Sequence, residues 1–157
     1  MRKIFSILFI LLLLILFLSR NINLFAEELK EINYSNEIRK PVVSGTFYPG
    51  SAEELKEKIE NLLNKVEKEE LKGELIGLIV PHAGYDYSGE IAAYAYKQLE
   101  GKNFNTVILI GESHYHRFPG ASIGNYQSYQ TPLGEVKVDN DLATNIINGE
   151  DKINFFP

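Results

Sequence analysis

Apolar residues first recur at helical spacing in the chain's second third. This pattern consists of Leu55, Ile59, Leu62, Leu63 and Val66. Positions three and four residues apart share one face of a helix, and the opposite face here carries Lys and Glu. Ser51 stands just before the run and Glu54 follows three residues later, which is the pattern of a capping box. We therefore predict a helix that begins immediately after Ser51 and turns its charged face to solvent.

Two short continuous apolar runs follow, at residues 75–80 and 106–110. Runs of this length with β-branched residues are typical of strands buried on both faces. Residues 88–99 between them have helical spacing, and we interpret Ser88 as the cap of that helix. A strand, helix and strand in this order predict neighbouring parallel strands.

The pattern after residue 130 predicts two further elements. Residues 135–138 are expected to form a strand, and Asp139 or Asn140 is expected to cap a helix that runs to about residue 147. The predicted fold class is therefore α/β, with a mostly parallel sheet flanked by helices.

The N-terminus differs in character from the rest of the chain. Arg2 and Lys3 precede residues 4–18, among which only Ser6 is polar. This is the layout of a secretory signal, and it is shorter than the roughly 20 apolar residues that span a bilayer. We predict a signal peptide or membrane anchor at 1–26, with cleavage after Ala26 as one possibility, then a linker at 27–40 and a domain at 41–157. The domain is expected to be exported, periplasmic or extracellular, or anchored by residues 4–18, with membrane contact through that segment only.

Charge and composition exclude several classes of function. The 157-residue chain has a net charge of −5 and no cysteine. Its length fits one domain. An acidic body without a basic stripe argues against a nucleic-acid partner. The lack of cysteine excludes thiolate ligands and a cysteine nucleophile within this chain.

All three histidines fall in the loops that follow the two predicted strands. His82 follows the first, and His114 and His116 follow the second. Ligands of open parallel sheets bind beyond the carboxyl ends of the strands, so His82 and His114 are expected to approach each other. Imidazole is a common ligand of zinc, iron and copper, and two histidines with a carboxylate suit non-heme iron. Three carboxylates are candidates to complete such a set: Asp86, Glu112 and Asp139.

Other interpretations of these residues remain open. A histidine after a strand often serves only as a loop or capping residue. Ser88 and Ser113 lie near histidines without a nucleophile-elbow pattern, and no phosphate-binding glycine motif is present. Four aromatic residues either line a pocket or simply pack: Phe47, Tyr48, Tyr85 and Tyr87.

Four motifs in a fixed order resemble the Memo-like proteins, known in prokaryotes as protein B of the AmmeMemoRadiSam system. They are Gly45-Thr46-Phe47-Tyr48-Pro49, then Pro81-His82-Ala83-Gly84-Tyr85 with Tyr87-Ser88-Gly89, then Ile110-Gly111 through Ser113-His114, and Tyr129-Gln130-Thr131-Pro132-Leu133-Gly134-Glu135 with Asp139. The resemblance runs from about Pro41 to the chain end.

The resemblance implies a fold similar to that of class III extradiol ring-cleaving dioxygenases. It implies metal binding through His82 and His114, with His116 in a supporting position at most. Glu112 departs from the family, in which a proline is common at that position. The family's further ligand lies in a later part of the chain. We therefore expect this sequence to be a truncated N-terminal part that is poorly stable, exposes apolar surface and binds metal weakly.

Three functions follow from this reading. The first is a metal-dependent redox enzyme of the dioxygenase type, with iron, copper or zinc as the ion. The second is a binding module that holds a peptide or small molecule, such as a small anion, in the same pocket without chemistry. The third is a hydrolase with a metal-activated water. The first would consume oxygen with a suitable substrate. The second would retain its ligand after the histidines are replaced, and the third would work with zinc and without oxygen.

Overall fold

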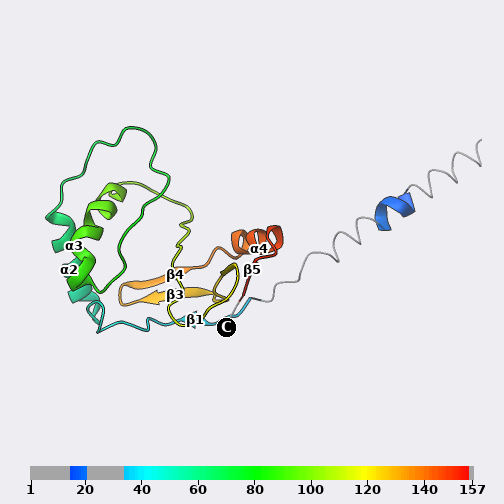
Figure 1. The fold of residues 1–157 in the computed structure, drawn as a ribbon, viewed down its shortest axis with the longest axis horizontal. Helices are drawn as coiled ribbons and strands as arrows, with labels where there is room; N and C mark the ends of the chain where they lie inside the picture. Colours follow the sequence, from blue (N-terminus) through cyan, green and yellow to red (C-terminus); the bar gives the residue numbers. More distant parts are fainter. Residues whose placement is uncertain (1–14, 21–33, 156–157) are drawn as a thin grey trace, which may run out of the picture. The chain divides into compact units, whose positions relative to one another are not determined.

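The computed structural model describes residues 15–20 and 34–155. The described residues form two compact units, one of residues 34–118 with 124–140, the other containing 119–123 and 141–155. Residues 15–20 are helical, and no helix within the described ranges is long and apolar enough to cross a membrane. The predicted leader at 1–26 and linker at 27–40 otherwise fall largely outside the described residues. Figure 1 shows the labelled elements.

The first predicted helix is confirmed as α2, Ala52–Asn64. Ser51 is its N-cap: the backbone N–H of Glu54 donates to the Ser51 hydroxyl, which donates to the Glu54 carboxylate at 2.9 Å. These bonds satisfy a backbone donor that the first helical turn leaves unpaired. Leu55 is buried, as the apolar face predicts, and Val66 just beyond the helix is buried as well.

The second predicted helix begins earlier than expected. It is α3, Tyr85–Tyr96, continued by the 3-10 turn η1, Lys97–Leu99, and its N-cap is Gly84. The interpretation of Ser88 as the cap was therefore wrong. Ser88 lies inside the first turn, where its hydroxyl donates to the carbonyl of Ala83 at 2.9 Å.

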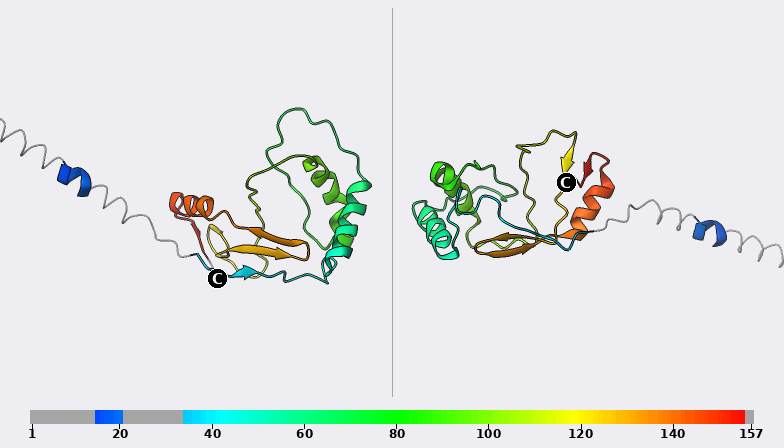
Figure 2. Two further views of the ribbon diagram at one scale, coloured as in Figure 1. Left: turned by 180° about the vertical axis from the view of Figure 1, so that it is seen from behind. Right: turned by 90° about the horizontal axis from the view of Figure 1, so that it is seen from below.

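Helices α2 and α3 pack side by side, as the views of Figures 1 and 2 agree. Gly89 allows the close approach, because a Cβ at this position would lie 2.9 Å from a methyl carbon of Leu62. Lys58 reaches across to Asp86 at 2.6 Å, and Lys65 reaches Glu90 at 2.9 Å. Apolar contact inside and ion pairs outside thus hold the pair together.

A three-stranded sheet lies in the same unit. Its strands are β1, Ile38–Arg39, then β3, Ser128–Thr131, and β4, Gly134–Lys137, in the order β1-β3-β4. β1 runs parallel to β3, whereas β3 and β4 form an antiparallel hairpin. The hairpin turns at Pro132 and Leu133, and Gly134 after them takes a φ of 131° that favours glycine. The strand predicted at 135–138 is thus confirmed with a shift of one residue.

The second unit contains the predicted C-terminal helix. This is α4, Asn140–Gly149, which buries Ala143 and Ile147 and belongs to this unit from Asp141 onward. A two-stranded parallel sheet joins β2, Ala121–Ser122, to β5, Ile153–Asn154. Its register is held by the N–H of Ala121, which donates to the carbonyl of Lys152 at 3.0 Å.

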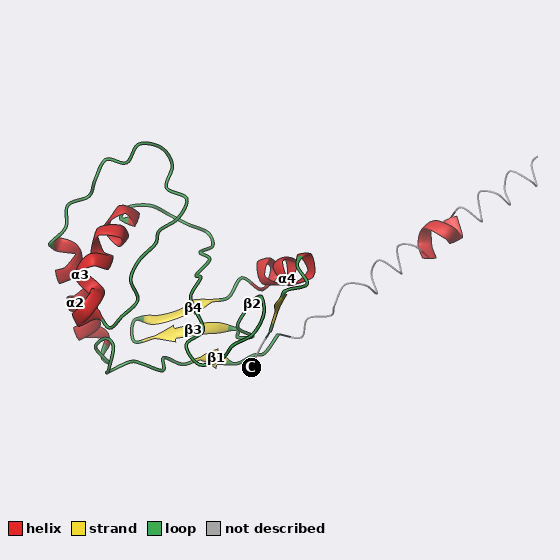
Figure 3. Cartoon of the chain, in the orientation of Figure 1, coloured by secondary structure: helices red, strands yellow, loops and turns green. Residues whose placement is uncertain are grey.

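The main correction concerns the predicted central sheet. Residues 75–80 and 106–110 belong to no strand, and Figure 3 draws both as loops. Ile76 and Ile79 are 95% and 102% exposed, and Ile110 is 93% exposed. The physical reason is that β3 already pairs with strands on both sides, and no described strand pairs with either apolar run. The fold described is therefore mixed α/β with small sheets, not one mostly parallel sheet.

Candidate metal centre

His82 lies in the short loop that leads into α3. The Ser88 hydroxyl binds the Ala83 carbonyl, and the N–H of Tyr85 donates to the carbonyl of Phe47 at 2.7 Å. Both bonds form at the start of a helix, where backbone donors and nearby polar groups lack intrahelical partners. They fix the backbone one and three residues after His82 and thereby position the imidazole.

The Gly45–Pro49 motif packs against this loop. A Cβ added at Gly84 would lie 3.3 Å from the Phe47 carbonyl oxygen, so glycine permits the close approach. The rings of Tyr48 and Tyr85 lie 5.6 Å apart between centroids. The motif at residues 45–49 is thus in direct contact with the motif at residues 81–85 and supports it.

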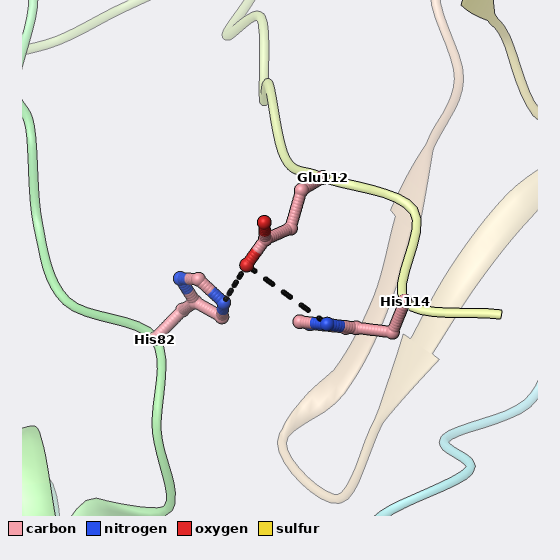
Figure 4. Close-up of side chains that lie close together, drawn as sticks. All are labelled: His82, Glu112 and His114. Carbon is pink, nitrogen blue, oxygen red and sulfur yellow. Dashed lines mark ion pairs between the residues drawn. The ribbon is translucent and has the colours of Figure 1, made fainter. Parts of the chain in front are cut away.

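His82, Glu112 and His114 come together at the ends of the two apolar segments, as Figure 4 shows. Nε2 of His82 lies 3.3 Å from Oε1 of Glu112, and Nδ1 of His114 lies 3.9 Å from the same oxygen. The two imidazole rings are 5.4 Å apart between centroids. The prediction that His82 and His114 approach each other is confirmed.

Glu112 stands between the two histidines. Glu112 and His114 are two residues apart in the same loop, and one oxygen of the Glu112 side chain lies near both imidazoles (Figure 4). The pattern Glu-x-His was visible in the sequence as a signal for this arrangement. Among the three candidate carboxylates, the geometry selects Glu112.

The donor atoms of the three residues fit a metal ion. One atom from each residue can be chosen so that all lie within 4.8 Å of one another. Ligand atoms that share an ion at about 2.0–2.2 Å lie roughly 3 to 3.5 Å apart, so small side-chain rotations would close the set. All three side chains are accessible, with exposed fractions of 66%, 66% and 57% for His82, Glu112 and His114. An ion would therefore reach the group directly from solvent.

The other two carboxylates have different partners. Asp86 accepts from Lys58 on α2, and Asp139 accepts from the hydroxyl of Thr106 at 2.7 Å. Neither carboxylate belongs to the group of His82, Glu112 and His114. His116 is also separate from the group, and its N–H donates to the Ser113 hydroxyl at 3.2 Å.

The four aromatic candidates divide into two pairs. Tyr48 and Tyr85 pack on each other and are partly buried, whereas Phe47 and Tyr87 are largely exposed. Burial raises the pKa of Tyr85 above its usual 10.0, and nearby Tyr96 and Tyr48 raise it further. Tyr85 is therefore neutral at physiological pH, and its ring packs on Tyr48 beside the His82 loop.

Comparison with protein families gives one match. The model of the Memo-like protein family matches residues 39–155. This stretch includes all four motifs, both histidines of the centre and Glu112. The resemblance that the motifs indicated is confirmed.

Individual relatives give the same result. A MEMO1 family protein of Nitrosopumilus maritimus is 40% identical over 118 residues, which is 71% of this chain and 42% of that protein. A MEMO1 family protein of Thermoplasma volcanium is 39% identical over 109 residues, which is 69% of this chain and 40% of that protein. A MEMO1 family protein of Aquifex aeolicus is 37% identical over 110 residues, which is 70% of this chain and 40% of that protein. The chain spans about two fifths of the length of the curated relatives that it matches.

Proposed function

Because this chain belongs to the Memo-like protein family, we propose that it binds a metal ion between His82, Glu112 and His114 and takes part in metal-dependent redox chemistry. One observation carries the proposal: both imidazoles converge on one carboxylate oxygen, at 3.3 and 3.9 Å. A carboxylate that contacts two imidazoles offers an anionic oxygen and two neutral nitrogens on one side of an ion. Two histidines with one carboxylate are the donor set of non-heme iron oxygenases.

The three side chains have distinct roles in this proposal. The imidazoles donate lone pairs and must be deprotonated at the coordinating nitrogen, whereas the carboxylate offsets part of the positive charge. Because all three approach from the ends of two segments, they occupy one side and leave positions for a substrate. When bound, ferrous iron supplies reactivity towards oxygen, and zinc or copper would supply different chemistry at the same donors.

The proposed fold relation is to the class III extradiol dioxygenases. The order of apolar segment, histidine loop, helix, apolar segment and second histidine loop supports it. The ligands of the proposed centre follow both apolar segments directly, as expected for a site at the carboxyl ends of strands.

A direct test uses the 157-residue chain and three variants. Wild-type protein is loaded anaerobically with ferrous iron or with zinc, and binding is measured by calorimetry. We expect one ion per chain, and at least about tenfold weaker binding in Glu112→Gln, since loss of a metal-site group commonly costs 10- to 100-fold. Glu60→Gln on α2 is the matched control, because Glu60 pairs with Lys56 on an exposed helix face.

Activity is then measured as oxygen uptake by the iron-loaded chain with a panel of small oxidisable molecules that includes aromatic diols. The proposal requires uptake that depends on iron and disappears in a His82→Ala/His114→Ala variant. Turnover with zinc and without oxygen would instead assign a hydrolase. A ligand that stays bound after both histidines are replaced would assign a non-catalytic binding module.

A further inference from the structure

One edge of the three-stranded sheet is unpaired in the part of the chain that the structure describes. Figure 1 shows β3 between β1 and β4, so β4, Gly134–Lys137, has β3 as its one neighbour in the sheet. Every residue of β4 is exposed, and Val136 has an exposed fraction of 68%. An unpaired edge presents a row of backbone donors and acceptors that can pair with another strand. The β4 edge is therefore a candidate interaction surface.

The hydrogen-bond pattern of the hairpin identifies the backbone groups on this edge. The N–H of Val138 donates to the carbonyl of Gln127 at 3.0 Å. Residues that bond to the neighbouring strand alternate along an antiparallel ladder, so Val136 also bonds to β3. The N–H and C=O groups of Glu135 and Lys137 therefore point away from β3 and form the open edge.

The charges on this edge complement a second copy of the same edge. Two copies of β4 that pair antiparallel about Val136 place Glu135 of each chain opposite Lys137 of the other. The two neighbouring registers that use the same backbone groups place Glu135 opposite Glu135, or Lys137 opposite Lys137. Opposite charges across a strand pair stabilise it, whereas like charges destabilise it. Charge and hydrogen bonding thus both favour the register centred on Val136.

We propose that two copies of this chain associate through β4, as an antiparallel pair centred on Val136 that continues the sheet from one copy into the other. Glu135 of each chain and Lys137 of the other exchange backbone hydrogen bonds, and the two Val136 side chains meet on the opposite face. The same surface is used on both copies, so the contact closes on itself at a dimer. This inference is independent of the proposed metal centre.

The composition of the edge also bears on the strength of the dimer. A lysine on an edge strand ordinarily keeps other edges away, but in this register Glu135 supplies the opposite charge to Lys137. A four-residue edge is much smaller than the roughly 800 Å² per partner of a standard stable interface. The dimer is therefore weak and depends on protein concentration.

An engineered cysteine at the centre of the contact tests the proposal, because the natural chain has no cysteine. The Cα atoms of a non-hydrogen-bonded antiparallel pair lie about 4.5 Å apart, within disulfide range. Full-length Val136→Cys is oxidised with diamide, which takes up the two electrons and two protons of the thiols. Ile91→Cys on α3 is the matched control, because Ile91 is 65% exposed. We expect intermolecular disulfides to form at least about tenfold faster in Val136→Cys, and equal rates would overturn the proposal.

Exchanging the charges tests the register in the Val136→Cys chain. Glu135→Lys and Lys137→Glu each place like charges opposite each other, so each variant alone should cross-link at least about threefold more slowly. A mixture of the two variants restores opposite charges and should cross-link near the parent rate, as heterodimers. Lys56→Glu and Glu60→Lys make the same charge changes on an exposed face of α2 and should leave the rate unchanged. Single variants as fast as the parent, a mixture as slow as the single variants, or slow control variants would overturn the proposal.

Discussion

The centre depends on two imidazoles that lie near one carboxylate. The His82 loop is fixed by the Ser88 hydroxyl and by the bond from Tyr85 to Phe47, and His114 lies two residues after Glu112 in the second loop. None of the three proposed ligands is buried. Their replacement should therefore affect binding far more than folding.

His82→Ala and His114→Ala should each abolish most metal binding in the full-length chain. Each variant removes one of two nitrogen donors, whereas the cost in stability should stay within about 0.5 kcal/mol because the side chains are exposed and contribute little packing. Metal titration followed by thermal unfolding checks both parts. His116→Ala is the control and should do less. An equal loss in all three variants would mean that the ligands are misassigned.

Tyr85 gives a pH-dependent prediction. Its pKa is raised by burial, so the folded state favours the neutral phenol and binds a proton more tightly than the unfolded state. Its contribution to stability is therefore complete below the unfolded pKa of about 10 and is lost as pH rises through the higher folded pKa. Wild type should lose more stability than Tyr85→Phe between pH 8 and pH 11, as measured by urea unfolding. Identical losses would contradict a raised pKa for Tyr85.

At the scale of elements, the helices could be predicted from sequence because their signals are local. The capping box at Ser51 and the apolar spacing beyond it identified α2, and Asn140 marked the start of α4. The start of α3 was misplaced because Gly84 caps it without a side chain, so the polar Ser88 gave the stronger signal.

Strands could be predicted less well because a strand requires a partner. Of the β3–β4 hairpin only β4 was predicted, and β3 at Ser128–Thr131 was missed. β1 at Ile38–Arg39 was missed inside the predicted linker, since it pairs with β3 ninety residues later. The apolar runs at 75–80 and 106–110 have strand composition, but composition does not say what they pair with.

Ser51→Ala tests the helix cap directly. It removes the oxygen that accepts the N–H of Glu54 and also the hydroxyl that donates to that residue's carboxylate. We expect a loss of about 1 kcal/mol in the free energy of unfolding, measured by urea denaturation. Ser51→Asp, which supplies an equally good capping oxygen, should keep most of the wild-type stability. If alanine and aspartate behave alike, the cap is not a source of stability for α2.

At the scale of the whole molecule, the motif order was sufficient to identify the family, because four short motifs share one order and spacing. The candidate site followed from the same motifs, with Glu112 added by geometry. We expected exposed apolar surface from the sequence, and the two apolar segments are exposed; their lack of any strand pairing was not predicted, because pairing depends on the elements available as partners. The chain covers about 42% of its Nitrosopumilus maritimus relative, so the activity of the whole protein remains a proposal.

Export is the prediction at this scale that concerns the N-terminus. Arg2 and Lys3 followed by the apolar residues 4–18 have the layout of a secretory signal. A reporter enzyme that works only outside the cytoplasm is fused after residue 40. We expect this fusion to show reporter activity. Activity of a reporter that works only in the cytoplasm would contradict the prediction. Export would also favour zinc or copper, because ferrous iron is easily oxidised outside the cytoplasm.

The metal content of the full-length chain purified from its own host tests the central claim most directly. Elemental analysis of the wild type, beside the His82→Ala/His114→Ala variant prepared in the same way, reports whether the centre is occupied where the protein works. We predict a transition-metal content of up to one ion per wild-type chain, lowered by the weak binding expected of this chain, and almost none in the variant. A wild type without metal, or a variant with the same content, would contradict a metal centre at His82, Glu112 and His114.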